Sequence, residues 1–123
     1  METSLAFIII AAALTLLGLF KFVAPKKFNE NSMGELHKEA VNPAAAIRSA
    51  LGGMVLTVAL IAFMSRDLDQ TAASVVLCAI GIGLVTTVVI VVLNKVRGFT
   101  LEIPIPPMIL LAVLSIIAFL AAC

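Results

Sequence analysis

Four long stretches without a charged side chain take up most of the 123 residues. Each is long enough, or nearly so, to cross a hydrocarbon core of about 30 Å as a helix that rises about 1.5 Å per residue. Backbone polar groups find no water in lipid, and four isolated stretches cannot close a β-barrel, so each must be helical. The stretches are residues 5–20, 49–64, 72–93 and 108–122.

Composition supports a membrane protein rather than a soluble one. Hydrophobic residues make up 63% of the chain, above the roughly 45–50% of a soluble domain. We therefore predict an all-α fold, a four-helix transmembrane bundle that forms a single domain over residues 1–123, with membrane lipid around it. A net charge of +1 gives no reason to expect nucleic acid as a partner. The predicted spans are residues 3–23, 43–65, 70–93 and 106–122.

Basic residues gather on one side of this topology. Loops one and three, with their edges, hold seven of the eight Lys and Arg residues, whereas Arg66 alone belongs to loop two. The positive-inside rule then predicts a bacterial inner-membrane protein with loops one and three in the cytoplasm and both termini outside. The seven are Lys21, Lys26, Lys27, Lys38, Arg48, Lys95 and Arg97.

Loop one, residues 25–42, is the only sizeable polar segment. Ser32 and Glu35 have the spacing of a capping box, which predicts a short amphipathic helix that starts at Ser32 and lies on the membrane surface. Asn42 and Pro43 are a suitable N-cap and first helical residue for span two. Asp69 is the expected N-cap of span three.

The loop between spans two and three, residues 66–69, is very short. It predicts a tight antiparallel hairpin of these two spans. Both spans carry small residues at helical spacing, and helices in lipid approach closely where side chains are small. We interpret these residues as packing positions within the bundle, and alternatively as a face for another subunit or another copy. They are Ala45, Ser49, Gly52, Gly53, Ala79 and Gly83.

Arg48 is the best candidate for a binding residue, because it lies a little over one turn into span two. A charge inside a span is costly unless it can reach water or a partner. The simplest interpretation is an anchor at the inner interface. Two alternatives stay open: a structural pair with Glu102, and a site for an anionic head group. Lys21 and Asn94 are expected at the same interface.

No catalytic set, metal site or cofactor site is predicted. His37 has no carboxylate or cysteine partners at metal-ligand spacing, which indicates a solvated surface histidine. Thr86 and Thr87 are expected to bond back to their own helix. No carboxylate lies inside a span, which argues against a proton-coupled transporter.

The start of span two resembles the signature of a family of small bacterial membrane proteins that is known only as a domain of unknown function. An Ile-Arg pair is followed by Gly-Gly, and the four spans fit as well. The resemblance implies a four-helix bundle distantly similar to DoxX-type proteins and no known activity. The chain departs from the family in two places. Members often have an Arg late in span three, where this chain has Asn94, and a Glu within span four, where this chain has only Ser115 as a polar residue. The matching residues are Ile47-Arg48-Ser49-Ala50-Leu51-Gly52-Gly53-Met54.

Taken together, these patterns predict a non-enzymatic protein. The favoured function is a structural or accessory subunit that packs against other membrane proteins or against itself. The alternative is a binder or carrier of a lipid or a quinone-like molecule, with Arg48 near its head group. A membrane redox enzyme is a third class, for which the sequence offers no residues.

Overall fold

The computed structural model describes residues 2–99 and 104–123, without the side chains of Ser32 and Met33. In this part of the chain helices are joined by short turns, and there is no strand. Four of its helical segments are long and apolar enough to cross a membrane, so the chain has the architecture of a multi-pass membrane protein. The elements are α1 (Thr3–Val23), α2 (Pro25–Met33), η1 (Lys38–Ala40), α3 (Val41–Met64), α4 (Gln70–Val96) and α5 (Ile105–Ala122).

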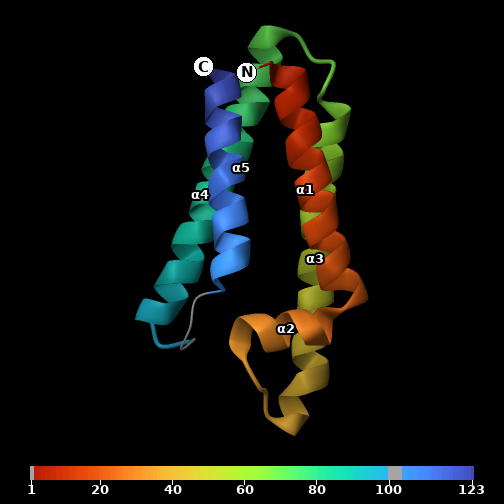
Figure 1. The fold of residues 1–123 in the computed structure, drawn as a ribbon, viewed down its shortest axis with the longest axis vertical. Helices are drawn as coiled ribbons and strands as arrows, with labels where there is room; N and C mark the ends of the chain where they lie inside the picture. The colour runs from red at the N-terminus through yellow and green to blue at the C-terminus, as the bar shows by residue number, and fades with distance from the viewer. Residues whose placement is uncertain (1, 100–103) are drawn as a thin grey trace.

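The four long helices form two pairs. One pair is α1 with α3, and the other is α4 with α5 (Figure 1). The pairs meet at the end that holds both termini and the α3–α4 turn, which we call the terminal end. They diverge toward the opposite end, where α2 lies crosswise below α1 and passes across α3. We call this opposite end the basic end.

The predicted hairpin of spans two and three is therefore wrong in its packing. The two helices follow each other through a short turn, yet no Cα atom of α3 comes within 8 Å of a Cα atom of α4. Each helix has a closer partner elsewhere, because its small residues fit a different neighbour. Gly52 of α3 faces Gly18 of α1, and Gly81 of α4 faces the ring of Phe119 on α5.

Gly18 and Gly52 let α1 and α3 touch backbone to backbone. A Cβ atom on Gly52 would lie 2.8 Å from the carbonyl oxygen of Gly18 and 3.0 Å from the Cβ of Lys21. Real Cβ contacts are longer, so only glycine allows this approach. Such close crossings are how helices associate in lipid, where water exclusion contributes little.

The hydrophobic core lies toward the terminal end, where all four long helices contribute to it. Its largest fully buried apolar side chains are Phe7 and Ile10 of α1, Leu77 of α4 and Leu114 of α5. From α3 it takes only Ala59 and Ala62. The core thus joins the two helix pairs at one end and leaves them free to separate toward the other.

Loop one contains a short helix, but not over the residues predicted: the expected helix began at Ser32, whereas α2 covers Pro25–Met33 and only the single turn η1 follows it in the loop. Helix α2 begins at Pro25, directly after α1, and ends at Gly34, whose φ of 75° suits only glycine well. Proline is favoured at the first position of a helix, so Pro25 starts a new helix where only the end of α1 was expected. Ser32 consequently lies in the last turn of α2.

The helix starts predicted at Asn42 and Asp69 have different outcomes. Helix α3 begins at Val41, one residue before Asn42, after the turn of η1, and no side chain caps it. Asp69 is the N-cap of α4, where its Oδ1 accepts a hydrogen bond of 2.8 Å from the backbone N–H of Ala72. The prediction for Asp69 is confirmed, and that for Asn42 is corrected.

Candidate functional site

A cleft of about 850 Å³ separates the two helix pairs. This volume is within the range of roughly 300–1,000 Å³ that is typical of small-molecule sites. One wall comes mainly from α3, the other mainly from α4, and α1 and α5 close it toward the core. Most of the lining is aliphatic, including Met54, Val58, Ile80 and Leu84. The cleft exists because α3 and α4 do not pack together.

Polar and charged groups line the cleft at its basic end. Lys21 comes from the last turn of α1 and Arg48 from the second turn of α3, while Asn94 comes from the opposite wall on α4. All three are half-buried. The cleft therefore has the polarity of an amphiphile, with a long apolar body and a cationic end.

The ring of Phe28 holds both cations. The Nζ atom of Lys21 lies 5.3 Å from the ring centroid, and the guanidinium carbon of Arg48 lies 4.7 Å from it. Phe28 belongs to α2, is only 5% exposed, and also packs on Phe20 of α1 with 5.4 Å between ring centroids. Cation–π attraction operates at such distances. Helix α2 thus contributes the aromatic surface that gathers the two charges.

Asn29, the next residue of α2, orients Arg48. The Nε of Arg48 donates a hydrogen bond of 2.8 Å to the Oδ1 of Asn29, whose side chain is almost completely buried. Arginine can only donate, so this bond also determines which way the amide of Asn29 points. The amide nitrogen of Asn29 is buried without a hydrogen-bond partner among the described residues. Such an unpaired group lowers the stability of the fold, so its presence indicates that Asn29 is kept for its contact with Arg48.

The glycine crossing determines where Lys21 lies. Gly52 is one turn after Arg48 on α3, and Gly18 is one turn before Lys21 on α1. Since the two glycines touch, the side chains of Lys21 and Arg48 leave neighbouring helices at the same level. The packing of α1 on α3 therefore brings two positive charges together.

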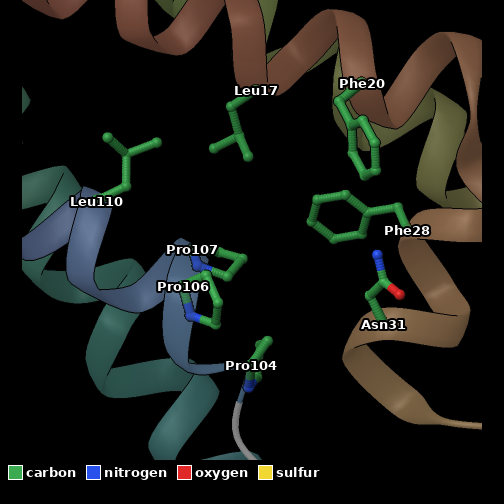
Figure 2. Close-up of a pocket in the computed structure, with 8 residues that line it drawn as sticks. All are labelled: Leu17, Phe20, Phe28, Asn31, Pro104, Pro106, Pro107 and Leu110. Atoms are coloured by element: carbon green, nitrogen blue, oxygen red, sulfur yellow. The ribbon is translucent and has the colours of Figure 1, made fainter.

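A second, smaller pocket of about 300 Å³ adjoins Phe28. Figure 2 shows Phe28 pointing from α2 into the space before α5, with Phe20 beside it and the prolines of α5 opposite. Leu17, Phe28, Pro104 and Pro107 line both this pocket and the cleft. Helix α2 thus borders the cleft and closes part of its basic end.

The predicted site residues meet only in part. Arg48 and Asn94 line the same cleft, as expected for groups at one interface. The expected pair of Arg48 with Glu102 falls outside the described residues. Among the described residues, the single ion pair joins Arg66 to Asp67, near the terminal end, with 3.9 Å between Nε and Oδ2.

The six predicted packing residues divide into three groups. Ala45 and Gly52 are buried and Ser49 is half-buried, whereas Gly53 is exposed and a Cβ atom there would meet nothing within 4 Å. Ala79 and Gly83 line the cleft, and a Cβ atom on Gly83 would likewise meet nothing. Packing within the chain therefore uses Gly52 and leaves Gly53 and Gly83 free.

The remaining polar residues behave as simple chemistry suggests. Thr86 and Thr87 donate to the carbonyl oxygens of Ile82 and Gly83, one turn back in α4, which confirms their expected local bonds. His37 is exposed, and its Nδ1 accepts from the backbone N–H of Glu39. Within residues 2–99 and 104–123, no three His, Cys, Asp or Glu side chains gather as metal ligands would.

Sequence reasoning missed Phe28 and Asn29 as parts of the site. A signal was present, since Pro25 directly after an apolar span is typical of a new helix. A helix from Pro25 turns Phe28 and Asn29 toward α3, where they contact Arg48. The spacing of Ser32 and Glu35 pointed to a later start and hid this relation.

No protein-family model, curated protein or solved structure matches this chain. The resemblance of residues 47–54 to a family of small membrane proteins therefore stays a prediction.

Proposed function

We propose that this protein holds an amphiphilic small molecule, a lipid or a quinone-like compound, between its two helix pairs. The cleft is the single observation that carries the proposal. Its aliphatic walls suit a hydrocarbon chain, and Lys21, Arg48 and Asn94 at one end suit a polar head. A molecule inserted in this way would have the orientation of a lipid in one leaflet, because the lining residues follow α3 from Arg48 to Ile61 and α4 from Val75 to Asn94.

We further propose that the basic end faces the cytoplasm of a bacterial cell and that both termini lie outside. The excess of Lys and Arg near the basic end supports this orientation. Cys123 follows α5 and is exposed, so it can report on sidedness. In a Cys78→Ser variant, a membrane-impermeant maleimide should label Cys123 on intact spheroplasts. Labelling only after the membrane is opened would reverse the proposed topology.

Filling the cleft should prevent binding. Gly83→Phe places a ring in the cleft without a clash at its Cβ, and should reduce the amphiphile that copurifies with the protein by about tenfold or more, a loss of about 1.4 kcal/mol. The measurement is lipid extraction and mass spectrometry of protein purified in mild detergent. Gly53→Phe is the matched control, because Gly53 is also open but does not line the cleft. Equal amphiphile content in both variants and the unchanged protein would reject the proposal.

The same pair of variants tests a second candidate function, an accessory subunit that packs on another membrane protein or on a second copy. The exposed Gly53 favours it, since a small residue on α3 that no helix of this chain covers allows close approach of another helix. This function requires Gly53→Phe to dissociate a copurifying subunit or a dimer while Gly83→Phe leaves it intact. A monomer in all three samples would reject it.

A further inference from the structure

Two cations meet at the basic end of the cleft, and no carboxylate pairs with either of them among the residues that the structure describes. Lys21 and Arg48 share the ring of Phe28, so their separation cannot exceed the sum of 5.3 Å and 4.7 Å. This is about one Debye length, roughly 10 Å at 0.1 M salt, and a partly desolvated pair is screened less than a pair in water. Among the described residues, no carboxylate oxygen lies within 4 Å of either cation. The arrangement favours an anion between or beside them.

Arg48 is prepared to bind that anion. Its Nε is occupied by Asn29, so the bond and the Phe28 ring hold the guanidinium in one orientation. The two terminal nitrogens, Nη1 and Nη2, have no hydrogen-bond partner among the described residues, although the side chain lines the cleft. A guanidinium that is free at this edge is the group that best grips two oxygens of a phosphate or a carboxylate.

The place of the cations selects the kind of molecule. Lys21 lies in the last turn of α1 and Arg48 lies against α2, while the aliphatic walls extend from them toward the core. Since no described carboxylate pairs with the two cations, a phosphate would neutralise them, whereas a neutral quinone ring would not. Basic pockets between transmembrane helices recognise anionic lipid head groups in this way.

We propose that Lys21 and Arg48 bind the phosphate of a phospholipid-class amphiphile whose hydrocarbon chain occupies the cleft between α3 and α4. This inference rests on the proposed function, and it names the ligand's head group. The ammonium group of Lys21 supplies a compact positive charge, and the planar guanidinium of Arg48 donates two parallel hydrogen bonds to the phosphate oxygens. Asn29 and Phe28 are positioning residues, since they act through Arg48 and Lys21.

The first test uses the unchanged protein and two probes with the same chains. Delipidated protein in detergent is titrated with dioleoyl phosphatidic acid and with dioleoylglycerol, which lacks only the phosphate, and binding is followed by native mass spectrometry. The phosphatidic acid should bind at least about tenfold more tightly, and the preference should shrink as salt is raised. Inorganic phosphate alone should compete only weakly.

Charge-matched variants then locate the head group. Arg48→Gln and Lys21→Gln should each reduce the preference for phosphatidic acid about tenfold. Arg97→Gln is the control for Arg48, because Arg97 also lies over a ring, 4.4 Å from the centroid of Phe99, but does not line the cleft. Lys26→Gln is the corresponding control for Lys21, since Lys26 is exposed outside the cleft. Neither control should change the preference. Asn29→Leu should weaken the effect of Arg48 without changing dioleoylglycerol binding.

Each other result has a defined meaning. The protein could instead bind both lipids with equal affinity, lose this binding in Gly83→Phe and keep it in Arg48→Gln. That result would overturn the phosphate site and leave the proposed function standing. Binding of neither lipid would overturn both. Inorganic phosphate that binds as tightly as phosphatidic acid would assign the cations to a free anion and overturn the lipid. If Arg48→Gln and Arg97→Gln reduced the preference for phosphatidic acid equally, the preference would depend on net charge alone, and the proposed site would be overturned.

Discussion

Replacing Gly52 with alanine should destabilise the protein, whereas the same change at the adjacent Gly53 should leave it as stable or slightly more so. A methyl group on Gly52 would lie 2.8 Å from a backbone oxygen of α1, which cannot rotate away, so α1 and α3 must separate. Forcing a group into a tight contact costs about 1–3 kcal/mol. At Gly53 the methyl meets nothing, and alanine is the better helix former by up to about 1 kcal/mol.

The free energy of unfolding should thus fall in Gly52→Ala and stay equal or rise slightly in Gly53→Ala. They can be measured in one detergent by thermal unfolding with a thiol-reactive dye, because Cys78 is half-buried in α4. Cys123 is exposed and is first replaced by serine. If the Gly52→Ala protein were as stable as the Gly53→Ala protein, α1 and α3 would not cross at Gly18 and Gly52. It would also remove the reason for placing Lys21 beside Arg48.

Replacing Phe7 with alanine should weaken the junction between the two helix pairs. Phe7 is completely buried in the core at the terminal end, where residues of all four long helices meet. In lipid the loss comes mainly from the cavity and its missing contacts, since the removed ring is not transferred to water. We expect a cost on the order of 2–3 kcal/mol, at or below the lower end of the roughly 3–5 kcal/mol that such a truncation costs in a water-soluble core.

Phe22→Ala is the matched control, because Phe22 lies on the same helix and is 58% exposed. Its change in unfolding free energy should be well below that of Phe7→Ala in the same dye assay. A second readout follows from the two-pair architecture: proteolysis in the turn at Asp67 and Leu68 should release separate halves more readily in Phe7→Ala. Equal stability of both variants would mean that the core does not join the pairs.

The sequence anticipated one half of the candidate site. Arg48 stood out because charges inside membrane spans are rare, and Asn94 because it directly follows the third predicted span. Both line the cleft. Phe28 and Asn29 carried no such signal in themselves, since an aromatic residue and an amide in a polar loop are ordinary, and only Pro25 indicated the helix that positions them. Their importance comes from contact with Arg48, which is 19 residues from Asn29 along the chain.

The cleft itself was not predicted, and the small residues show why. Gly52 and Gly53 are equivalent in a sequence pattern, as are Gly81 and Gly83, yet in each pair one packs tightly and the other is open. Successive residues of a helix point about 100° apart, since 3.6 residues make a turn, so neighbouring positions face different surroundings. Which face meets which helix depends on shape complementarity along the whole helix, and periodicity does not contain that information.

Hydropathy and charge alone determined that this chain has four membrane-crossing helices, where most of them begin and end, and that one end of the molecule is basic. These properties are local, because lipid requires every span to satisfy its own backbone and to exclude charge. Only the tertiary structure decided that the spans pair as α1 with α3 and α4 with α5, leaving a cleft that ends at two cations on one aromatic ring. Helix pairing in lipid depends on a few close contacts between small residues and aromatic rings, which become visible only when the helices are placed side by side.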